Sequence, residues 1–593
     1  MKNIYEYMPY GAVRYGGYVK YSIDFVKEKQ LLDKELWIKF IEVFHTLEDG
    51  VDKGWRGEYW GKMMRGACHT YMYDNDKKLY DIIDFAVTEL LKQQDEFGRF
   101  STYNTQLEFH GWDVWSRKYV LTGLAHFYKI CIDENKKQKV LSAMKKHTDY
   151  MLDRIGNDKL SIFETSDDWG GLNSSSILEP ICELYNLTGE KKYLDFAEYI
   201  LNLGGCKYGN LLDLAEQGNV MPFEYPEVKA YEMMSYFEGV LAYYEITGKV
   251  KYYDIVDKFV QALFLTDITI VGSCGCSHEL FDNSVEKQSE FTNNLMQETC
   301  VTVTLMRLVS RLYMLKGEQK YADIIELSAL NALYGTINEN DLMQYSSPNK
   351  EYLKGLPFDS YSPLANSKRG MEIGGIRKFA SGGHYGCCGS IASVGIAIYP
   401  LTSVVNSQDF IIVNNYLNGE ITFDNIKFVI NGSYLIDGKV NISLYTKEDK
   451  RVKIKLRIPC WAKSVKAQYN NKDLKCQDQI IFVDEIVKDG DKINLEFGVE
   501  LKEIIVNGRT AFKYGALVLS QKIKEDYKFG QQIKLQRENG KIKYEIISAN
   551  DTHIEVLLYL KDGKSIKLIN YSDSGKDWLN KDTIVNVWFN VLE

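Results

Sequence analysis

The stretch 185-YNLTGEKKYLDFAEYI-200 decides the fold, because it joins the end of one apolar-periodic segment to the start of another. Gly189 follows an aromatic helix end and fits the left-handed residue that commonly terminates a helix. The polar residues 190–192 then open a second periodic segment. We therefore interpret this stretch as the elbow of a helical hairpin.

The same plan recurs along the first two thirds of the chain. Clear copies are 244-YEITGKVKYYDIVDKF-259 and 313-YMLKGEQKYADIIELS-328, and weaker ones lie at 73–91 and 131–147. The elbows return every 55 to 69 residues, a period that equals two helices and a long loop and is typical of stacked helical arrays. The segment 33–47 and the region before residue 400 raise the count to about six hairpins. We predict an α/α toroid rather than an open solenoid, because its long inner loops would converge on one cavity.

The pattern changes near residue 400. From residue 409 onward, short alternating segments rich in Val, Ile, Tyr and Thr are separated by Asn-Gly and Asp-Gly pairs, which indicate β-hairpins. We predict a catalytic α/α-barrel domain over residues 1–404, a β-sandwich domain over 405–505 and a second β-sandwich over 506–593. We expect the β domains to brace the toroid and to shape its entrance or a dimer contact, so a homodimer is an expected assembly.

The composition argues against several functional classes. A net charge of −9 is unfavourable for binding nucleic acid or an anionic membrane surface. The chain contains no run of about 18 apolar residues that would predict a transmembrane helix. The N-terminal residues are too polar for a signal peptide. Most of the 11 cysteines are scattered singly, which indicates reduced thiols and predicts a cytoplasmic protein.

Two adjacent cysteines, Cys387 and Cys388, stand in 381-SGGHYGCCGS-390, which we interpret as a loop freed by its glycines. Upstream, Glu298 and Cys300 lie in the first turns of a long apolar-periodic segment. Residues two apart point to different sides of a regular helix, so both can reach one ion only at an irregular helix start. Three thiolates and one carboxylate would suit tetrahedral zinc. The alternative is that these are core thiols that never meet, because the spacing matches no standard zinc motif.

Several motifs together resemble the β-L-arabinofuranosidases of glycoside hydrolase family 127 and, more closely, its sister family 146. The resemblance covers nearly the whole chain and implies a catalytic α/α toroid, β-sandwich domains and a zinc ion held by one Glu and three Cys. The motifs are GEYWGKMMRGA (57–67), WDVWSRKYVLTGL (112–124), NSSSILEPICELYNLTGEKKYLDFAEYI (173–200), KAYEMMSYFEGVLAYYEITG (229–248), ETCVTVTLMRL (298–308), YGCCGS (385–390) and LRIPCWA (456–462).

Carried over residue by residue, the resemblance implies that Glu298, Cys300, Cys387 and Cys388 are the zinc ligands. It also implies that Cys387 is the nucleophile of a retaining exo-glycosidase that acts on plant-derived oligosaccharides. A thiolate is the attacking species, and zinc coordination deprotonates a thiol. The resemblance places the general acid/base at Glu279.

Candidate substrate contacts come from the same motifs. In the packing alternative, Trp112 only packs helices, and Tyr385 with its neighbour His384 only buttresses the cysteine segment. Glu232 is a further residue that would face the cavity. The candidates are Trp112, Asp113, Lys118, Tyr231, Lys229, His278, Tyr345 and Tyr385.

The chain departs from the family at Lys229, where the related enzymes usually carry histidine. A cation there indicates either an anionic sugar as substrate or a lysine that points away. Other toroid enzymes, such as unsaturated uronyl hydrolases and sugar epimerases, have no use for three cysteines that meet one glutamate. A non-catalytic carbohydrate-binding protein with structural zinc is the alternative from another class.

Overall fold

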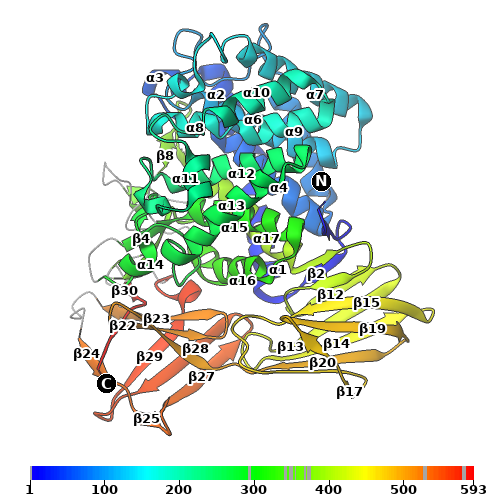
Figure 1. Ribbon diagram of the computed structural model, residues 1–593, viewed down its shortest axis with the longest axis vertical. Coiled ribbons are helices and arrows are strands. Elements are labelled where there is room, and N and C mark those ends of the chain that lie inside the picture. The colour runs from blue at the N-terminus through cyan, green and yellow to red at the C-terminus, as the bar shows by residue number, and fades with distance from the viewer. Residues whose placement is uncertain are drawn as a thin grey trace.

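The computed structural model describes residues 3–290, 295–339, 344–345, 352–353, 356–365, 367, 369, 375–524, 531–576 and 583–592. Helices fill most of the first two thirds of the chain, and β-sheets fill the last third (Figure 1). The predicted fold class, an α/α toroid followed by all-β domains, is confirmed. None of the helices in these ranges combines the length and the apolar character needed to span a bilayer.

The inner helices of the toroid form a closed ring, in which each packs against the next and α17 returns to α4. All 17 residues of α17 are buried, because an inner helix contacts neighbours on both sides and an outer helix behind. The inner helices are α4 (Gly57–Asp74), α6 (Asp113–Ile130), α9 (Leu178–Thr188), α12 (Ala230–Thr247), α15 (Thr299–Lys316) and α17 (Cys387–Ser403).

Outer helices complete the hairpins. The N-terminal helices α1 (Gly17–Val26) and α2 (Lys34–Thr46) pack on α17 and α4, so the sixth pair joins the two ends of the helical region. The other outer helices, each following an inner one, are α5 (Lys77–Leu91), α7 (Glu134–Leu152), α10 (Lys191–Asn202), α13 (Val250–Thr266) and α16 (Gln319–Ser328).

At three elbows the first helix ends in the left-handed glycine that the sequence predicts, and at a fourth Asn75 takes this conformation. Asn75, Gly189, Gly248 and Gly317 have φ angles of 54°, 68°, 70° and 72°, and each donates its N–H to the carbonyl four residues earlier. The fifth elbow differs, because Cys131 is extended with φ −66° and ψ 127°. Asp133 instead caps the following helix by accepting from the backbone of Asn135 and Lys136.

Two sheets follow the toroid. One has the strand order β1-β10-β11-β15-β19-β18 and the other β17-β16-β20-β14-β13-β12-β2, so each includes one N-terminal strand, β1 (Glu6–Tyr7) or β2 (Val13–Tyr15). Their strands alternate between buried and exposed residues, as in β14 and β20, which is expected for strands with one face on a core. The C-terminal strands are β10 (Val404–Asn406), β11 (Ile411–Val413), β12 (Gly419–Phe423), β13 (Ile426–Gly432), β14 (Lys439–Thr446), β15 (Lys450–Arg457), β16 (Val465–Tyr469), β17 (Lys472–Asp473), β18 (Cys476–Gln477), β19 (Ile480–Val487) and β20 (Asp491–Phe497).

A third sheet forms the end of the chain and packs against the toroid. Its order is β21-β22-β23-β29-β28-β27, and β30 also pairs with β23. Val518 and Trp588 share a buried cluster with Val271 and Leu364 of the helical region. The strands are β21 (Leu501–Val506), β22 (Arg509–Tyr514), β23 (Leu517–Lys524), β27 (Tyr544–Asn550), β28 (His553–Tyr559), β29 (Ser565–Asn570) and β30 (Thr583–Asn586).

The N-terminal strands pair with strands of the C-terminal β region. Strands β1 (Glu6–Tyr7) and β2 (Val13–Tyr15) precede the first helix, yet they pair with β10 and β12 in the two middle sheets. The fully buried Arg457 of β15 donates to Glu326 of α16 at 2.9 Å and to the Asn414 carbonyl at 2.8 Å. These contacts hold the β domains against the base of the toroid.

Candidate metal centre and active site

Four side chains from two distant segments converge at the N-terminal ends of the inner helices. One ligand atom from each of Glu298, Cys300, Cys387 and Cys388 lies within 4.8 Å of every other. The Cys300 and Cys388 sulfurs are 3.4 Å apart, and the Cys387 and Cys388 sulfurs are 3.8 Å apart. Glu298 Oε1 is 3.4 Å from Cys388 Sγ and 3.9 Å from Cys387 Sγ. The expectation that these residues meet agrees with this geometry.

Local backbone changes explain how each pair points at one place. Glu298 ends strand β4 (Leu295–Glu298) and is the extended N-cap of α15, with φ −77° and ψ 136°. The change from strand to helix turns its side chain toward that of Cys300, as expected for an irregular helix start.

The second pair corrects an expectation. Cys387 and Cys388 are not in a loop but are the first two residues of α17, directly after strand β9 (His384–Gly386). Gly386 is the extended N-cap, so the strand-to-helix junction provides the turn. The glycine that approaches the cysteines is instead Gly375, where a Cβ would stand 2.0 Å from Cys387 Sγ.

The residues fit a tetrahedral zinc ion. All four are buried, and among the described residues Glu298 Oε2 is a buried oxygen without a hydrogen-bond partner. Tetrahedral coordination with Zn–S bonds of about 2.3 Å sets sulfurs about 3.8 Å apart, close to the observed separations. The N-termini of α15 and α17 both face the sulfurs, and a helix N-terminus favours negative charge.

Electrostatics single out Cys387 within the cluster. Hydrogen bonds from Cys300 and Cys388, aided by the charges of Lys62 and Lys229, hold the pKa of Cys387 well below its usual value. Burial instead raises the pKa of Cys388. Burial, together with the Cys387 charge, raises the pKa of Glu298 to about 8. Cys387 is therefore the sulfur most readily present as thiolate.

A buried lysine that the sequence analysis missed lies beside the cluster. Lys62 of α4 places its Nζ 3.9 Å from Cys300 Sγ and 2.9 Å from Glu58 Oε1. Trp115 donates its indole N–H to the other Glu58 oxygen. Both Glu58 and Lys62 lie in 57-GEYWGKMMRGA-67, where their i, i+4 spacing on an apolar helix was the available signal.

Glu279, the expected acid/base, is joined to the cluster through Tyr361. The Tyr361 hydroxyl donates to Glu279 Oε1 at 3.1 Å. Burial, and then the charges of Glu298 and the three cysteines, raise the pKa of Tyr361, which lies opposite Glu298 on the neighbouring strand β7 (Tyr361–Ala365). Lys229 forms an ion pair with Glu279 Oε2. The next residue, Ala230, donates its backbone N–H to the backbone oxygen of Glu279 at 2.9 Å, which fixes the segment that carries Glu279.

Lys229 therefore faces the acid/base candidate and does not point away from the site. Its Nζ also lies 4.8 Å from the centre of the Trp169 ring. Trp169 has a φ of 57°, which is strained for a bulky residue and is often found at functional sites. Only the glycines after it, in 167-DDWGG-171, signalled an unusual turn.

The remaining candidates divide into two groups. Tyr231 lies beside Lys62, with its ring centre 4.5 Å from Lys62 Nζ, and its hydroxyl bonds to Tyr119. Half-buried Trp112 caps α6 and packs edge-on against Trp55 at 6.0 Å. His278 stacks edge-on against Tyr361 at 4.9 Å. These three residues are near groups that surround the cluster.

Asp113, Lys118 and Tyr385 are engaged in the protein interior. Asp113 accepts from Ser101 at 2.6 Å and from Phe109 N at 2.8 Å, which secures the loop before α6. Lys118 is buried, donates to Ser176, and has its pKa lowered to about 7 by burial. Tyr385 packs on Phe40 and contacts Gln30, as the buttress alternative predicts.

Tyr345 belongs to β5 (Gln344–Tyr345), but its side chain lies outside the described part of the chain.

Two further cysteines, Cys274 and Cys276, are buried thiols, and burial raises the pKa of both. Cys276 Sγ lies 3.8 Å from the backbone oxygen of Ser284. Among the described residues, the Glu298 cluster is the one group with three or more close metal-ligating side chains.

Two family models match the sequence of this chain. The GH127 β-L-arabinofuranosidase catalytic-domain model matches residues 19–354, and the corresponding middle-domain model matches residues 410–499. No curated protein sequence is significantly similar to the chain.

Solved structures share the fold across the whole chain. The GH127 β-arabinofuranosidase BT3674 is 18% identical, with a TM-score of 0.72, and the match covers 100% of this chain and 98% of that one. The GH127 β-L-arabinofuranosidase Ara127N from Geobacillus stearothermophilus T6 is 15% identical, with a TM-score of 0.70 and coverage of 98% and 100%. Because the catalytic-domain model alone spans more than half of the sequence, the chain belongs to the β-L-arabinofuranosidase family GH127 and is a glycoside hydrolase.

Proposed function

We propose that the protein is a retaining exo-glycosidase that removes β-L-arabinofuranosyl residues from plant-derived oligosaccharides. The observation that carries this proposal is that Glu298, Cys300, Cys387 and Cys388 lie together at the N-terminal ends of α15 and α17. Cys387 is the proposed nucleophile and Glu279 the proposed acid/base.

Glu298, Cys300, Cys387 and Cys388 would hold a zinc ion. When bound, zinc would keep the sulfurs deprotonated and supply positive charge beside them. The protein supplies charge of its own, because Lys62 lies beside Cys300 and the two helix N-termini face the sulfurs.

The reaction proceeds in two steps at Cys387 and Glu279. The Cys387 thiolate attacks the anomeric carbon, the glycosidic C–O bond breaks, and Glu279 donates a proton to the departing oxygen. Glu279, now a carboxylate, takes a proton from water as that water attacks the same carbon. The C–S bond breaks, Cys387 regains its electron pair, and the sugar leaves with its original anomeric configuration.

The ion pair between Lys229 and Glu279 supports a neutral sugar over an anionic one. The charge of Lys229 is balanced by the carboxylate form of Glu279, which is the form that takes a proton from water in the second step. Lys229 then serves to orient Glu279, with Tyr361 holding the other oxygen. Tyr231, Trp112 and His278 are the proposed sugar contacts.

We further propose the domain boundaries 404/405 and 505/506, a cytoplasmic location and a homodimeric assembly. The middle-domain match over residues 410–499 supports the first boundary. An enzyme in the cytoplasm would act on short oligosaccharides that the cell has imported.

The test combines activity and metal content in three proteins: wild type, Cys387→Ala and Glu279→Gln. Wild type is expected to contain one zinc per chain and to release nitrophenol from a nitrophenyl β-L-arabinofuranoside. Both variants are expected to lose activity. Full activity in the Cys387 variant would exclude it as nucleophile, and zinc-free active wild type would exclude the metal.

A further inference from the structure

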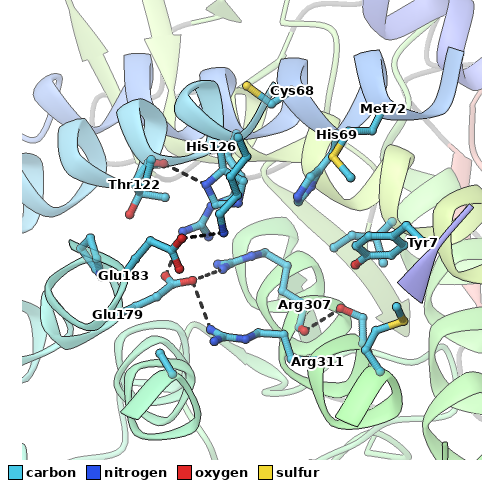
Figure 2. A pocket seen from close by; sticks show the side chains of 18 of the residues that line it. Tyr7, Cys68, His69, Met72, Thr122, His126, Glu179, Glu183, Arg307 and Arg311 are labelled. Carbon is cyan, nitrogen blue, oxygen red and sulfur yellow. Dashed lines mark hydrogen bonds and ion pairs between the residues drawn. The ribbon is translucent and has the colours of Figure 1, made fainter. Parts of the chain in front are cut away.

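A second polar pocket lies inside the toroid at the end opposite the cysteine cluster. It has a volume of about 280 Å³, near the lower end of the range for small-molecule sites (about 300–1,000 Å³). Its walls come from all six inner helices, α4, α6, α9, α12, α15 and α17, and Tyr7 of the N-terminal strand lies at one side (Figure 2).

The pocket is separate from the active site along the helix axes. Arg307 and Arg311 of α15 line it, and they follow Cys300 by seven and eleven residues. At 1.5 Å per residue, these positions lie about 10 and 16 Å further along the helix. The inner helices thus present their N-terminal ends to the cysteine cluster and their later turns to this pocket.

A network of ion pairs forms the floor of the pocket. Glu179 is held by Arg65 at 2.9 Å. It also pairs with Arg307 at 2.9 Å and with Arg311 at 3.3 Å (Figure 2). Arg307 also pairs with Glu238 at 2.8 Å, and Arg311 pairs with Glu245 at 2.9 Å. Each carboxylate of this network is therefore engaged by at least one arginine, while Glu238 Oε1 has no partner among the described residues.

Several buried polar atoms in and beside the pocket have no hydrogen-bond partner among the described residues. Arg65 is buried, and among the described residues its Nε and Nη1 have no partner. The same holds for the buried hydroxyl of Thr122 and for Nδ1 of His69, which both line the pocket. Buried polar groups are nearly always satisfied in folded proteins, so these atoms indicate a bound polar species.

The pocket lining carries four basic side chains and three carboxylates, namely Arg65, Lys129, Arg307 and Arg311 against Glu179, Glu183 and Glu245. Burial, and then the nearby charge of Arg307, lower the pKa of Arg65. Burial and the charge of Arg65 lower the pKa of His69 to about 3, so its imidazole is neutral. Among the described residues that line the pocket, Arg65 is the one basic side chain with buried donors that lack a partner. One partly paired guanidinium matches a single negative charge.

We propose that this pocket binds a small organic monocarboxylate. Arg65 receives the carboxylate, Thr122 and His69 complete its hydrogen bonds, and the carbon body lies against Met72, Ala125 and Pro180, which also line the pocket. A cavity of about 150 Å³ holds benzene in another protein, so an aromatic acid fits the available volume.

Calorimetric titration of the full-length protein with benzoate, benzamide and inorganic phosphate tests this proposal. Benzoate is expected to bind and to raise the melting temperature. Benzamide has the same shape without the charge and is expected to bind at least tenfold more weakly. Equal binding of benzamide, binding of phosphate without benzoate, or no benzoate binding up to tens of millimolar would each overturn the proposal.

Variants locate the site. Arg65→Met is expected to weaken benzoate binding at least tenfold, while the matched surface variant Arg451→Met leaves it unchanged. Thr122→Val keeps the side-chain shape and charge, so it carries the test if Arg65→Met does not fold, and it is expected to weaken binding several-fold. Unchanged affinity in Thr122→Val and Arg65→Met would place benzoate elsewhere and overturn the proposal.

Discussion

Lys62 places its ammonium nitrogen 3.9 Å from the sulfur of Cys300, at the buried side of the four-residue cluster. A cluster of three thiolates and one carboxylate carries more negative charge than one divalent ion balances. Lys62 is fixed for this role by Glu58 at 2.9 Å and by the ring of Tyr231. With the proposed zinc ion bound, the lysine would therefore offset ligand charge that the ion alone leaves uncompensated.

Lys62→Met is accordingly expected to weaken zinc binding. Residues that support metal ligands without touching the metal typically change affinity or activity by about 10- to 100-fold. Zinc retention during dialysis against a competing chelator measures this effect, and Lys77→Met, which removes an exposed lysine, is the control. Equal retention in Lys62→Met and wild type would show that Lys62 is only a packing residue.

Lys229→Met is expected to lower kcat/KM by about 10- to 100-fold on a neutral arabinofuranoside, because Glu279 loses one of the two groups that orient it. Lys229→His, which carries the residue usual in the related enzymes, is expected to retain more activity than Lys229→Met. Initial rates on a nitrophenyl arabinofuranoside measure both variants. A variant that loses activity only on uronate-type substrates would instead assign Lys229 to substrate recognition.

The buried carboxyl of Asp359 is expected to make the free energy of unfolding fall as the pH rises. Burial raises the pKa of its carboxyl to about 7, above the ordinary value of 3.8. The folded state therefore holds a proton that the unfolded state releases first, and stability is lost as the pH rises from about 4 to 7. Asp359→Asn removes this loss, so its unfolding free energy relative to wild type should rise by about 3–4 kcal/mol across that window.

Thermal unfolding of wild type and Asp359→Asn at several pH values between 4 and 8 measures this difference. The gap between the two melting temperatures should widen with increasing pH and level off above about 7. A constant gap over the whole range would mean that the Asp359 carboxyl titrates alike in the folded and unfolded states.

Arg457→Met is expected to destabilise the protein by about 3–5 kcal/mol, the usual result of removing one partner from a buried ion pair. The change removes the cation that pairs with Glu326 and Asp323 of α16, and it leaves the Asn414 carbonyl without this donor. Tyr434 and Trp461 still donate to Glu326. Arg451→Met breaks an exposed pair with Asp484 and should cost less than about 1 kcal/mol. Equal stability of the two variants would show that the Arg457 contacts do not anchor the domains.

The helical elbows could be predicted because each is encoded locally. A glycine such as Gly248 or Gly317, set between an aromatic helix end and a polar turn, is sufficient to indicate the reversal. The strand alternation after residue 409 is equally local. These two patterns account for the toroid and the all-β region.

Contacts between distant segments were not accessible from such patterns. Strands β1 and β2 precede the helices but complete sheets formed some 400 residues later. The four cluster residues were anticipated by family resemblance, yet the contact of Lys62 with Cys300 across 238 positions has no local signature. The sequence predicts Asp113 as a substrate contact, whereas its carboxylate holds the loop before α6 through Ser101. An acid next to a tryptophan gives the same sequence pattern whether it binds a sugar or fixes a loop.

The central claim is that Cys387 forms a covalent bond to the sugar. Glu279→Gln mixed with a nitrophenyl β-L-arabinofuranoside provides the most direct test, because the activated leaving group departs without an acid while hydrolysis of the intermediate is slowed. Peptide mass spectrometry is predicted to find one anhydropentose on the peptide that carries Cys387. An adduct on another residue, or steady nitrophenol release with an unmodified Cys387 peptide, would contradict the account.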